Sequence, residues 1–297
     1  MPRVKQPKVP AKKVKLELFS LHGHVGNQPA DYVRLFRALA AANPKSRTDM
    51  SRERVDAIPV FREENGKFFF TAYTGSAEAT FLVLDLEAST EEERGLERGK
   101  VVVRKTLGVI DSARREAVIQ FVHHGLRAHH IAQLLEKFAR ALYPDFSELS
   151  LEFTPVPGAS FLQELEEFNR IQSASVRIAR PNYDWEEYGQ TLETLGQDSG
   201  ARNLEVAAVA NRNSTLSKQS GLIGLMKDLL QKGRSSIKGA WVMGQKGNRE
   251  GLISLNLNKH IEAVTVEVPT SPTGQPLETE VRDIAARMLN DRNEQAQ

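Results

Sequence analysis

Residues 54–73 read RVDAIPVFREENGKFFFTAY, and no other stretch of the N-terminal half constrains its structure as strongly. Two apolar runs, 55–62 and 67–73, flank Glu64-Asn65-Gly66. Asn and Gly both tolerate the positive φ angles of a tight two-residue turn, so this pattern is typical of a β-hairpin. We therefore expect an antiparallel hairpin within a larger sheet.

On both sides of this hairpin the sequence continues in strands and helices. Alternating apolar and polar residues predict strands at 14–21, 80–86, 100–107 and 117–123. Apolar residues at helical spacing predict helices at 28–42 and 129–142. The acidic stretch 91–97 is expected to form a short, solvent-exposed helix. Together these elements predict a strand-rich α+β domain at 14–145.

The C-terminal half alternates between strands and helices. We expect a strand from 147, and then helices at 159–169, 184–196 and 220–231 and strands at 173–179 and 203–209. Such β–α repeats build a mixed or parallel sheet with flanking helices. An antiparallel hairpin of 237–245 and 252–257, a strand at 262–268 and a helix at 277–289 follow. The predicted fold class is α/β (α+β), with a C-terminal α/β domain at 146–291 and a frayed tail at 292–297.

Length and composition narrow the class of protein. The chain has 297 residues, which suits about two domains, and its mean hydropathy of −0.41 is that of a folded globular protein. It has no cysteine, which excludes disulfides, thiolate metal sites and cysteine nucleophiles. No apolar run reaches the roughly 18 residues that cross a bilayer. We expect a cytoplasmic protein without membrane insertion.

Positive charge is concentrated in two segments. Residues 1–13 are basic, contain three prolines and have no acidic residue, so we expect a flexible arm that can find phosphates. Between Arg212 and Lys259 there are nine basic residues against two acidic ones. Such a field, mixed with short polar side chains, suits a nucleic-acid backbone. The candidate nucleic-acid-binding residues are Lys5, Lys8, Lys12, Lys13, Arg212, Lys218, Lys232, Arg234, Lys238, Lys246, Arg249 and Lys259.

Signals of an enzyme are weak. No Glu-x-Lys lies on a predicted strand, and the chain has neither a P-loop nor a Gly-x-Ser-x-Gly elbow. His22 and His24 can share one face of a strand but supply only two of the ligands that zinc requires. We assign no catalytic residue, metal or cofactor. A metal-dependent nuclease built around His22 and His24, and a protein-binding scaffold, remain alternatives to DNA binding.

One set of motifs resembles a known group of proteins. The motifs are the strand–helix opening Leu16–Leu39, the strand Leu149–Phe153, the segment Ser175–Asn182 before an acidic-aromatic helix and the strand Leu204–Val206, and the strands within Leu252–Val268. They resemble an uncharacterised bacterial family similar in layout to the phage-exclusion protein RexA and, more loosely, to the Kiwa defence protein KwaB. The resemblance implies binding of DNA without strong sequence preference, a homodimer, and a protein partner in phage defence. It implies no catalytic residues. We expect the DNA to be double-stranded.

Overall fold

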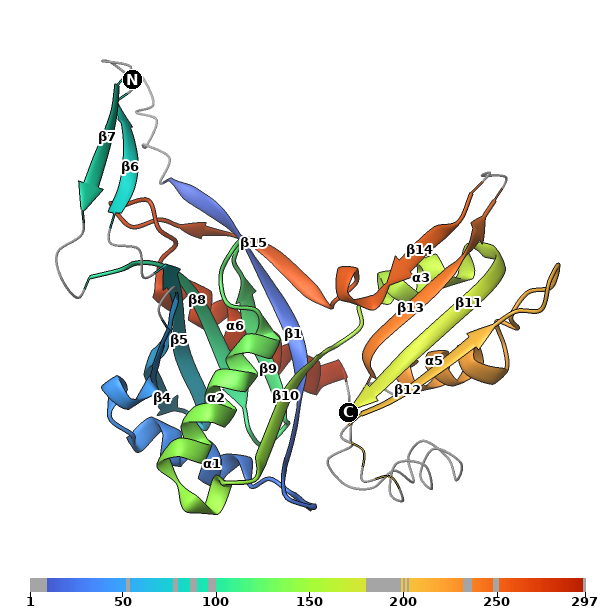
Figure 1. Ribbon diagram of the computed structural model, residues 1–297, viewed down its shortest axis with the longest axis horizontal. Coiled ribbons are helices and arrows are strands. Elements are labelled where there is room, and N and C mark those ends of the chain that lie inside the picture. The colour runs from blue at the N-terminus through green and yellow to red at the C-terminus, as the bar shows by residue number, and fades with distance from the viewer. Residues whose placement is uncertain are drawn as a thin grey trace, which may run out of the picture.

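The computed structural model describes residues 10–51, 54–76, 80–85, 90–95, 100–179, 199, 201, 203–231, 237–247 and 251–295. They form a nine-stranded sheet, a four-stranded sheet and a two-stranded ribbon, with helices packed on the two larger sheets (Figure 1). The predicted α+β class is confirmed. Every strand pairing between these residues is antiparallel, so the parallel sheet that the sequence allowed in the C-terminal half is not formed.

The predicted hairpin is confirmed as β4 (Arg54–Glu64) and β5 (Lys67–Ser76). Asn65 and Gly66 have φ angles of 50° and 75°, as the turn requires. Around them the sheet runs in the order β10-β1-β9-β8-β5-β4-β3, with β15 and β2 also paired to β1. The other strands are β1 (Ala11–Val25), β2 (Gln28–Pro29), β3 (Thr48–Met50), β8 (Val102–Asp111), β9 (Glu116–Phe121), β10 (Leu149–Pro155) and β15 (Ala263–Pro269).

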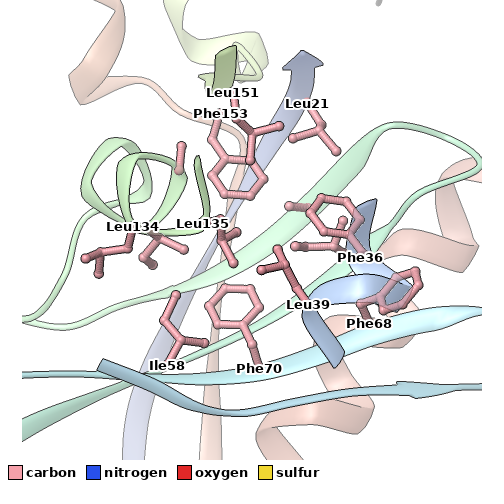
Figure 2. Close-up of a cluster of buried hydrophobic side chains, with 14 of the residues drawn as sticks. Leu21, Phe36, Leu39, Ile58, Phe68, Phe70, Leu134, Leu135, Leu151 and Phe153 are labelled. Carbon is pink, nitrogen blue, oxygen red and sulfur yellow. The ribbon is translucent and has the colours of Figure 1, made fainter. Parts of the chain in front are cut away.

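Two helices cover one face of this sheet. Helix α1 (Tyr32–Ala41) begins at Asp31, whose side chain accepts a hydrogen bond from the Arg34 backbone N–H. Helix α2 (Ala128–Leu142) lies beside it, and apolar side chains of both helices meet those of the strands in one core (Figure 2). Phe36, Phe68 and Phe70 are fully buried there. Burial of side chains of this size stabilises the fold by about 2–3 kcal/mol each.

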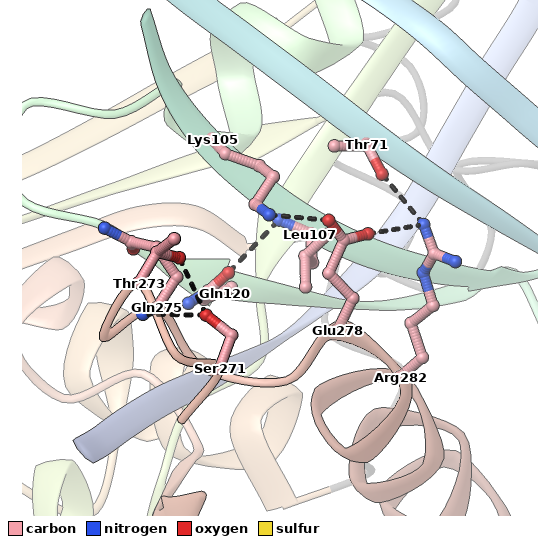
Figure 3. A network of polar contacts seen from close by, with 9 residues as sticks. All are labelled: Thr71, Lys105, Leu107, Gln120, Ser271, Thr273, Gln275, Glu278 and Arg282. Carbon is pink, nitrogen blue, oxygen red and sulfur yellow. Dashed lines mark hydrogen bonds and ion pairs between the residues drawn. The ribbon is translucent and has the colours of Figure 1, made fainter. Parts of the chain in front are cut away.

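The opposite face is covered by α6 (Glu278–Gln295) from the far end of the chain. Polar contacts fix the first turns of this helix on the sheet (Figure 3). Glu278 accepts a hydrogen bond from Lys105 at 2.5 Å, and Arg282 donates to the Thr71 hydroxyl at 2.9 Å. The C-terminal helix therefore belongs to the N-terminal sheet.

The second sheet has the order β12-β11-β13-β14. Its strands are β11 (Phe168–Ala179), β12 (Asn203–Val209), β13 (Ile237–Lys246) and β14 (Ile253–Asn256), and a 3₁₀ turn, η4 (Leu257–Lys259), follows β14. Helices α3 (Ala159–Glu166) and α5 (Gly221–Gln231) pack on one face of the sheet through a common apolar core. The other face carries no helix among the described elements.

The chain passes twice between the two sheets, which differs from the predicted boundary near residue 145. Strand β10, strand β15 and helix α6 pack in the first sheet, although the sequence places them in a domain at 146–291. The two connections run side by side, with Gly158 N–H donating to the His260 carbonyl at 2.7 Å. The four-stranded sheet and its helices form one lobe, and the nine-stranded sheet and its helices form the other. The four-stranded lobe is inserted between strands β10 and β15 of the nine-stranded lobe. Local periodicity identified these strands, but it carries no information on which distant edge each one joins.

Three further predictions differ from the structure. The acidic stretch forms a strand, β7 (Thr90–Gly95), because it pairs with β6 (Thr80–Asp85) instead of standing alone in solvent. Residues 11–13 lie in β1 and not in a flexible arm, because β15 provides a pairing edge. Helix α6 continues to Gln295, past the predicted start of fraying at 292. The predicted helix at 184–196 lies outside the described residues.

No helix in the described part of the chain is both long and apolar enough to cross a membrane.

Candidate nucleic-acid interface

The predicted cations do not form one common surface in the described ranges. Lys5, Lys8, Lys232, Arg234 and Arg249 lie outside the described residues. Lys12 and Lys13 are exposed in β1, where they face Val268 and Glu267 of β15 in register. Their backbone is held in the sheet, and the preceding Pro10 carbonyl accepts a hydrogen bond from the Thr270 backbone N–H at 2.9 Å.

Several cations of the Arg212–Lys259 run are neutralised within the protein. Lys246 binds Glu164 at 2.8 Å and Glu167 at 3.4 Å, and its ammonium lies 5.0 Å from the centre of the Phe168 ring. Its side chain is only 14% exposed, so it does not project from the turn as its position in a hairpin suggested. The hydrogen bond from Lys246 holds the pKa of Glu164 below its ordinary value.

Helix α3, which carries Glu164, also carries Glu166, and this residue binds two more lysines. Glu166 of α3 pairs with Lys227, which lowers the pKa of the carboxyl, and its backbone carbonyl accepts a hydrogen bond from Lys218 at 2.6 Å. Lys238 of β13 pairs with Glu152 of β10. By contrast Arg212 and Lys259 are exposed, and neither forms an ion pair with a described residue. The carboxylates come from 152–167, so counting charge within 212–259 missed them.

A hollow of about 420 Å³ lies between the two lobes. Its floor is apolar, with side chains of Phe19 and Phe153 from the first sheet. Arg127 and His129, at the start of α2, line it from the first lobe, and Arg177, Lys238 and Asn258 line it from the second. Glu17 of the first lobe lines it as well, so the hollow combines an apolar floor with a charged rim contributed by both lobes.

Phe121, at the end of β9, is the exposed aromatic side chain of this hollow. It is 38% exposed, and the Arg127 guanidinium lies 4.0 Å from the centre of its ring. The Lys15 ammonium lies 5.1 Å from the same ring while it pairs with Glu17 at 2.8 Å. Cations near the face of an aromatic ring gain about 0.5–1 kcal/mol each at exposed sites, so the three side chains hold one another in place.

His129 is kept neutral by its surroundings. Burial lowers the pKa of His129 below its ordinary value of 6.5, and the positive charges of Lys238 and Arg127 lower it further, as does His130. At pH 7 the imidazole is therefore an uncharged hydrogen-bonding group in the lining of the hollow.

A second hollow, of about 170 Å³, opens on the helix-free face of the four-stranded sheet. It is lined by Ser175, Arg177, Glu205, Lys238, Gly239, Ala240, Trp241, Asn256 and Asn258. Arg177, Lys238 and Asn258 line both hollows, so the two form one groove. We call this continuous surface the interlobe groove.

An irregularity in β13 shapes the junction of the two hollows. Arg177 faces Gly239 and Ile178 faces Ile237, which leaves Lys238 as an extra residue without a partner in the register. A β-bulge of this kind redirects a side chain, and here Lys238 reaches Glu152 of the other lobe. Sequence periodicity predicts the strand but not the bulge.

Four residues of the groove are not among the binding residues predicted from the sequence: Phe121, Arg127, Arg177 and Trp241. Arg177 and Trp241 lie on predicted strands. Strict alternation places their side chains on the face of the sheet that is opposite to the buried side chains of Val176 and Val242. That alternation is a usable signal for an open sheet face. Phe121 and Arg127 carry no signal, because only the fold brings the end of β9 to the second lobe.

The histidines proposed as metal ligands lie elsewhere. His22 and His24 are buried in β1, facing Glu152 and Ser150 of β10 in register. Across the described residues, no three or more His, Asp or Glu side chains lie close enough to hold a metal ion.

A second polar cluster joins α3 to the end of η4. Ser160 Oγ lies 3.2 Å from His260 Nδ1, and His260 Nε2 lies 3.6 Å from Glu164 Oε1. The order serine–histidine–carboxylate is that of a nucleophilic triad. However, Glu164 is already bound to Lys246, and the described lining of the adjacent hollow includes Glu164 and Lys246 but neither Ser160 nor His260. We interpret the cluster as a structural link at the root of the second lobe.

Comparison with known proteins supplies no relative: no family model matches the chain, and no curated protein is similar to it. The resemblance to the RexA-like family stays a prediction from short motifs.

Proposed function

We propose that this protein binds nucleic acid, DNA in the first place, without sequence preference and without catalysing a reaction. The observation that carries the proposal is the interlobe groove, in which Arg127 and the ion-paired Arg177 and Lys238 stand beside the exposed Phe121 and the half-buried Trp241. Aromatic rings beside a basic groove bind nucleic acid in a sequence-tolerant way, because every base has a face on which to stack.

The proposal differs from charge-driven binding along the 212–259 run. Lys218, Lys227, Lys238 and Lys246 are each bound by a carboxylate or carbonyl of the protein, so they neutralise fewer phosphates than their number suggests. If three or four cations contact phosphates, log K falls by about 2–3 units per tenfold rise in salt on a single strand. Binding then depends on stacking as well as on charge.

The homodimer and the protein partner in phage defence are proposed from the RexA-like resemblance alone. The proposed cytoplasmic location rests instead on the apolar pattern of the sequence. These parts of the proposal do not depend on the groove. If the protein binds nucleic acid but has another biological role, the proposed molecular function still holds.

The test is a mobility-shift series with the full chain on single-stranded DNA, double-stranded DNA and RNA, at several salt concentrations. Arg127→Ala removes a cation of the groove, and Arg62→Ala is the matched control, because Arg62 pairs with Glu64 at the remote β4–β5 turn. We expect Arg127→Ala to weaken binding at least about five-fold, and the control to change it less than two-fold. Equal effects of both substitutions, or no binding of any nucleic acid at low salt, would overturn the proposal.

A further inference from the structure

The four-stranded sheet has one face packed on helices and one open face. Ala174, Val176 and Ile178 of β11 are buried against the α3–α5 side. Because successive strand residues point to opposite faces, Ser175 and Arg177 lie on the open side, together with Trp241 and Gly239 of β13. The smaller hollow of the interlobe groove lies on this open face.

Gly239 forms the floor of that hollow. A Cβ atom built on Gly239 would meet no other atom within 4 Å, so the space above it is open. Arg177 faces Gly239 across the ladder, and Trp241 lies on the same face two residues along the strand. Ser175 and Asn256 flank Trp241 on either side in register. The hollow is thus bounded by an indole, a guanidinium and short polar side chains.

The charges that line the hollow are balanced. Arg177 donates to Glu205 at 2.8 Å, and Lys238 is paired with Glu152. A phosphate here would meet cations that already hold carboxylates, and the negative Glu205 would repel it. A neutral, planar group with both donors and acceptors gains contacts from Arg177, Glu205 and Asn256 without displacing an ion pair.

The size of the hollow limits the ligand further. At about 170 Å³ it holds the volume of about five or six water molecules, which suits one planar ring system and not a sugar and phosphates as well. Arg177, Lys238 and Asn258 form its boundary with the larger hollow. The rest of a bound chain can therefore continue from there toward Arg127 and Phe121.

We propose that the hollow above Gly239 receives one unpaired nucleobase, stacked on Trp241 and bound at its edge by Arg177, Glu205 and Asn256. This inference rests on the proposed function and narrows its ligand to nucleic acid with unpaired bases. Bases inside a duplex present only their edges and cannot enter, so single strands bind more tightly than the duplex of the same sequence.

The experiment compares a 15-mer of thymidines with a 15-mer of abasic nucleotides, which has the same phosphates but no bases. With the full chain, we expect the thymidine strand to bind at least about five-fold more tightly, because stacking on an aromatic side chain strengthens binding of each base. Gly239→Leu fills the hollow and should reduce the affinity for the thymidine strand toward that for the abasic strand. Ala11→Leu, another small-to-large change in an exposed strand position, is the matched control and should change neither.

A second variant guards against a folding defect in Gly239→Leu. Trp241→Leu keeps an apolar side chain at this position but removes the ring, and it should weaken thymidine binding at least about five-fold while abasic binding is unchanged. The nucleobase site would be overturned if the wild type bound both strands with equal affinity, or if folded variants kept the wild-type preference for the thymidine strand over the abasic strand. Either result would be compatible with the proposed nucleic-acid binding. Absence of binding to either strand and to duplex DNA would instead overturn the proposed function.

Discussion

Replacing Lys246 with alanine tests whether this lysine stabilises the fold or binds a phosphate. Lys246 holds Glu164 at 2.8 Å and Glu167 at 3.4 Å, and it lies over the ring of Phe168. The carboxylates are 40% and 63% exposed, so each pair contributes at most about 1 kcal/mol, and the ring contact adds about 0.5–1 kcal/mol. We expect Lys246→Ala to lower the free energy of unfolding by about 1–2 kcal/mol.

The same substitution should leave nucleic-acid binding almost unchanged. A lysine that contacts a phosphate contributes about 0.9 to the slope of log K against log salt on duplex DNA. Lys246 is already neutralised, so we expect its removal to change the slope by less than about 0.3. Lys259→Ala is the comparison, because Lys259 is exposed in η4 and should change the slope without loss of stability.

Urea unfolding followed by circular dichroism measures the first effect, and a salt series of binding isotherms measures the second. Our reasoning would be refuted if Lys246→Ala kept wild-type stability and reduced the slope by about 0.9, since that is the behaviour of a free phosphate contact.

Three further predictions concern stability and titration. Arg47→Met should lower the free energy of unfolding by about 3–5 kcal/mol in a urea titration, because the buried guanidinium donates to four backbone carbonyls at 2.6–2.9 Å; a loss under 1 kcal/mol would contradict this. The lowered pKa of Glu164 implies stability that is present above its ordinary pKa of 4.5 and is lost as the pH falls through the folded value. Melting temperatures should therefore fall less steeply between pH 6 and pH 3 in Glu164→Gln than in the wild type, and identical slopes would count against the pairing. For His129, an NMR titration should give a pKa below 6.5 that rises in Lys238→Met, whereas an unchanged value would show that Lys238 does not act on the ring.

Local sequence patterns predicted most elements of the fold but few of their long-range partners. The Asn65-Gly66 turn and the α2 helix follow from neighbouring residues, and both are confirmed. Strand β7 was predicted as a helix because the charges of Glu91, Glu92 and Glu93 were read without the strand that pairs with them. Likewise β10 and β15 were recognised as strands, but only the fold shows that both pair with β1.

The candidate site was harder to predict for the same physical reason. Charge counting over 212–259 treats each lysine as free, whereas Glu152, Glu164 and Glu166 lie 52–86 residues away from the lysines that they bind. The buried Arg47 is a second case, since the bulge at Ile58 and Pro59 turns two carbonyls toward it, and no sequence pattern indicates that bulge. Ion pairs across the fold, and not composition, decide which cations remain available for a ligand.

Photo-crosslinking tests directly whether nucleic acid lies in the interlobe groove. A single-stranded oligonucleotide that carries 5-iodouracil is bound to the full chain, irradiated and digested, and the attached residues are identified by mass spectrometry. Because the halogenated base reacts with aromatic rings on which it stacks, we predict crosslinks at Trp241 and Phe121, which disappear at Trp241 in Gly239→Leu. Crosslinks confined to residues outside the groove, with none at Trp241 or Phe121, would contradict the account.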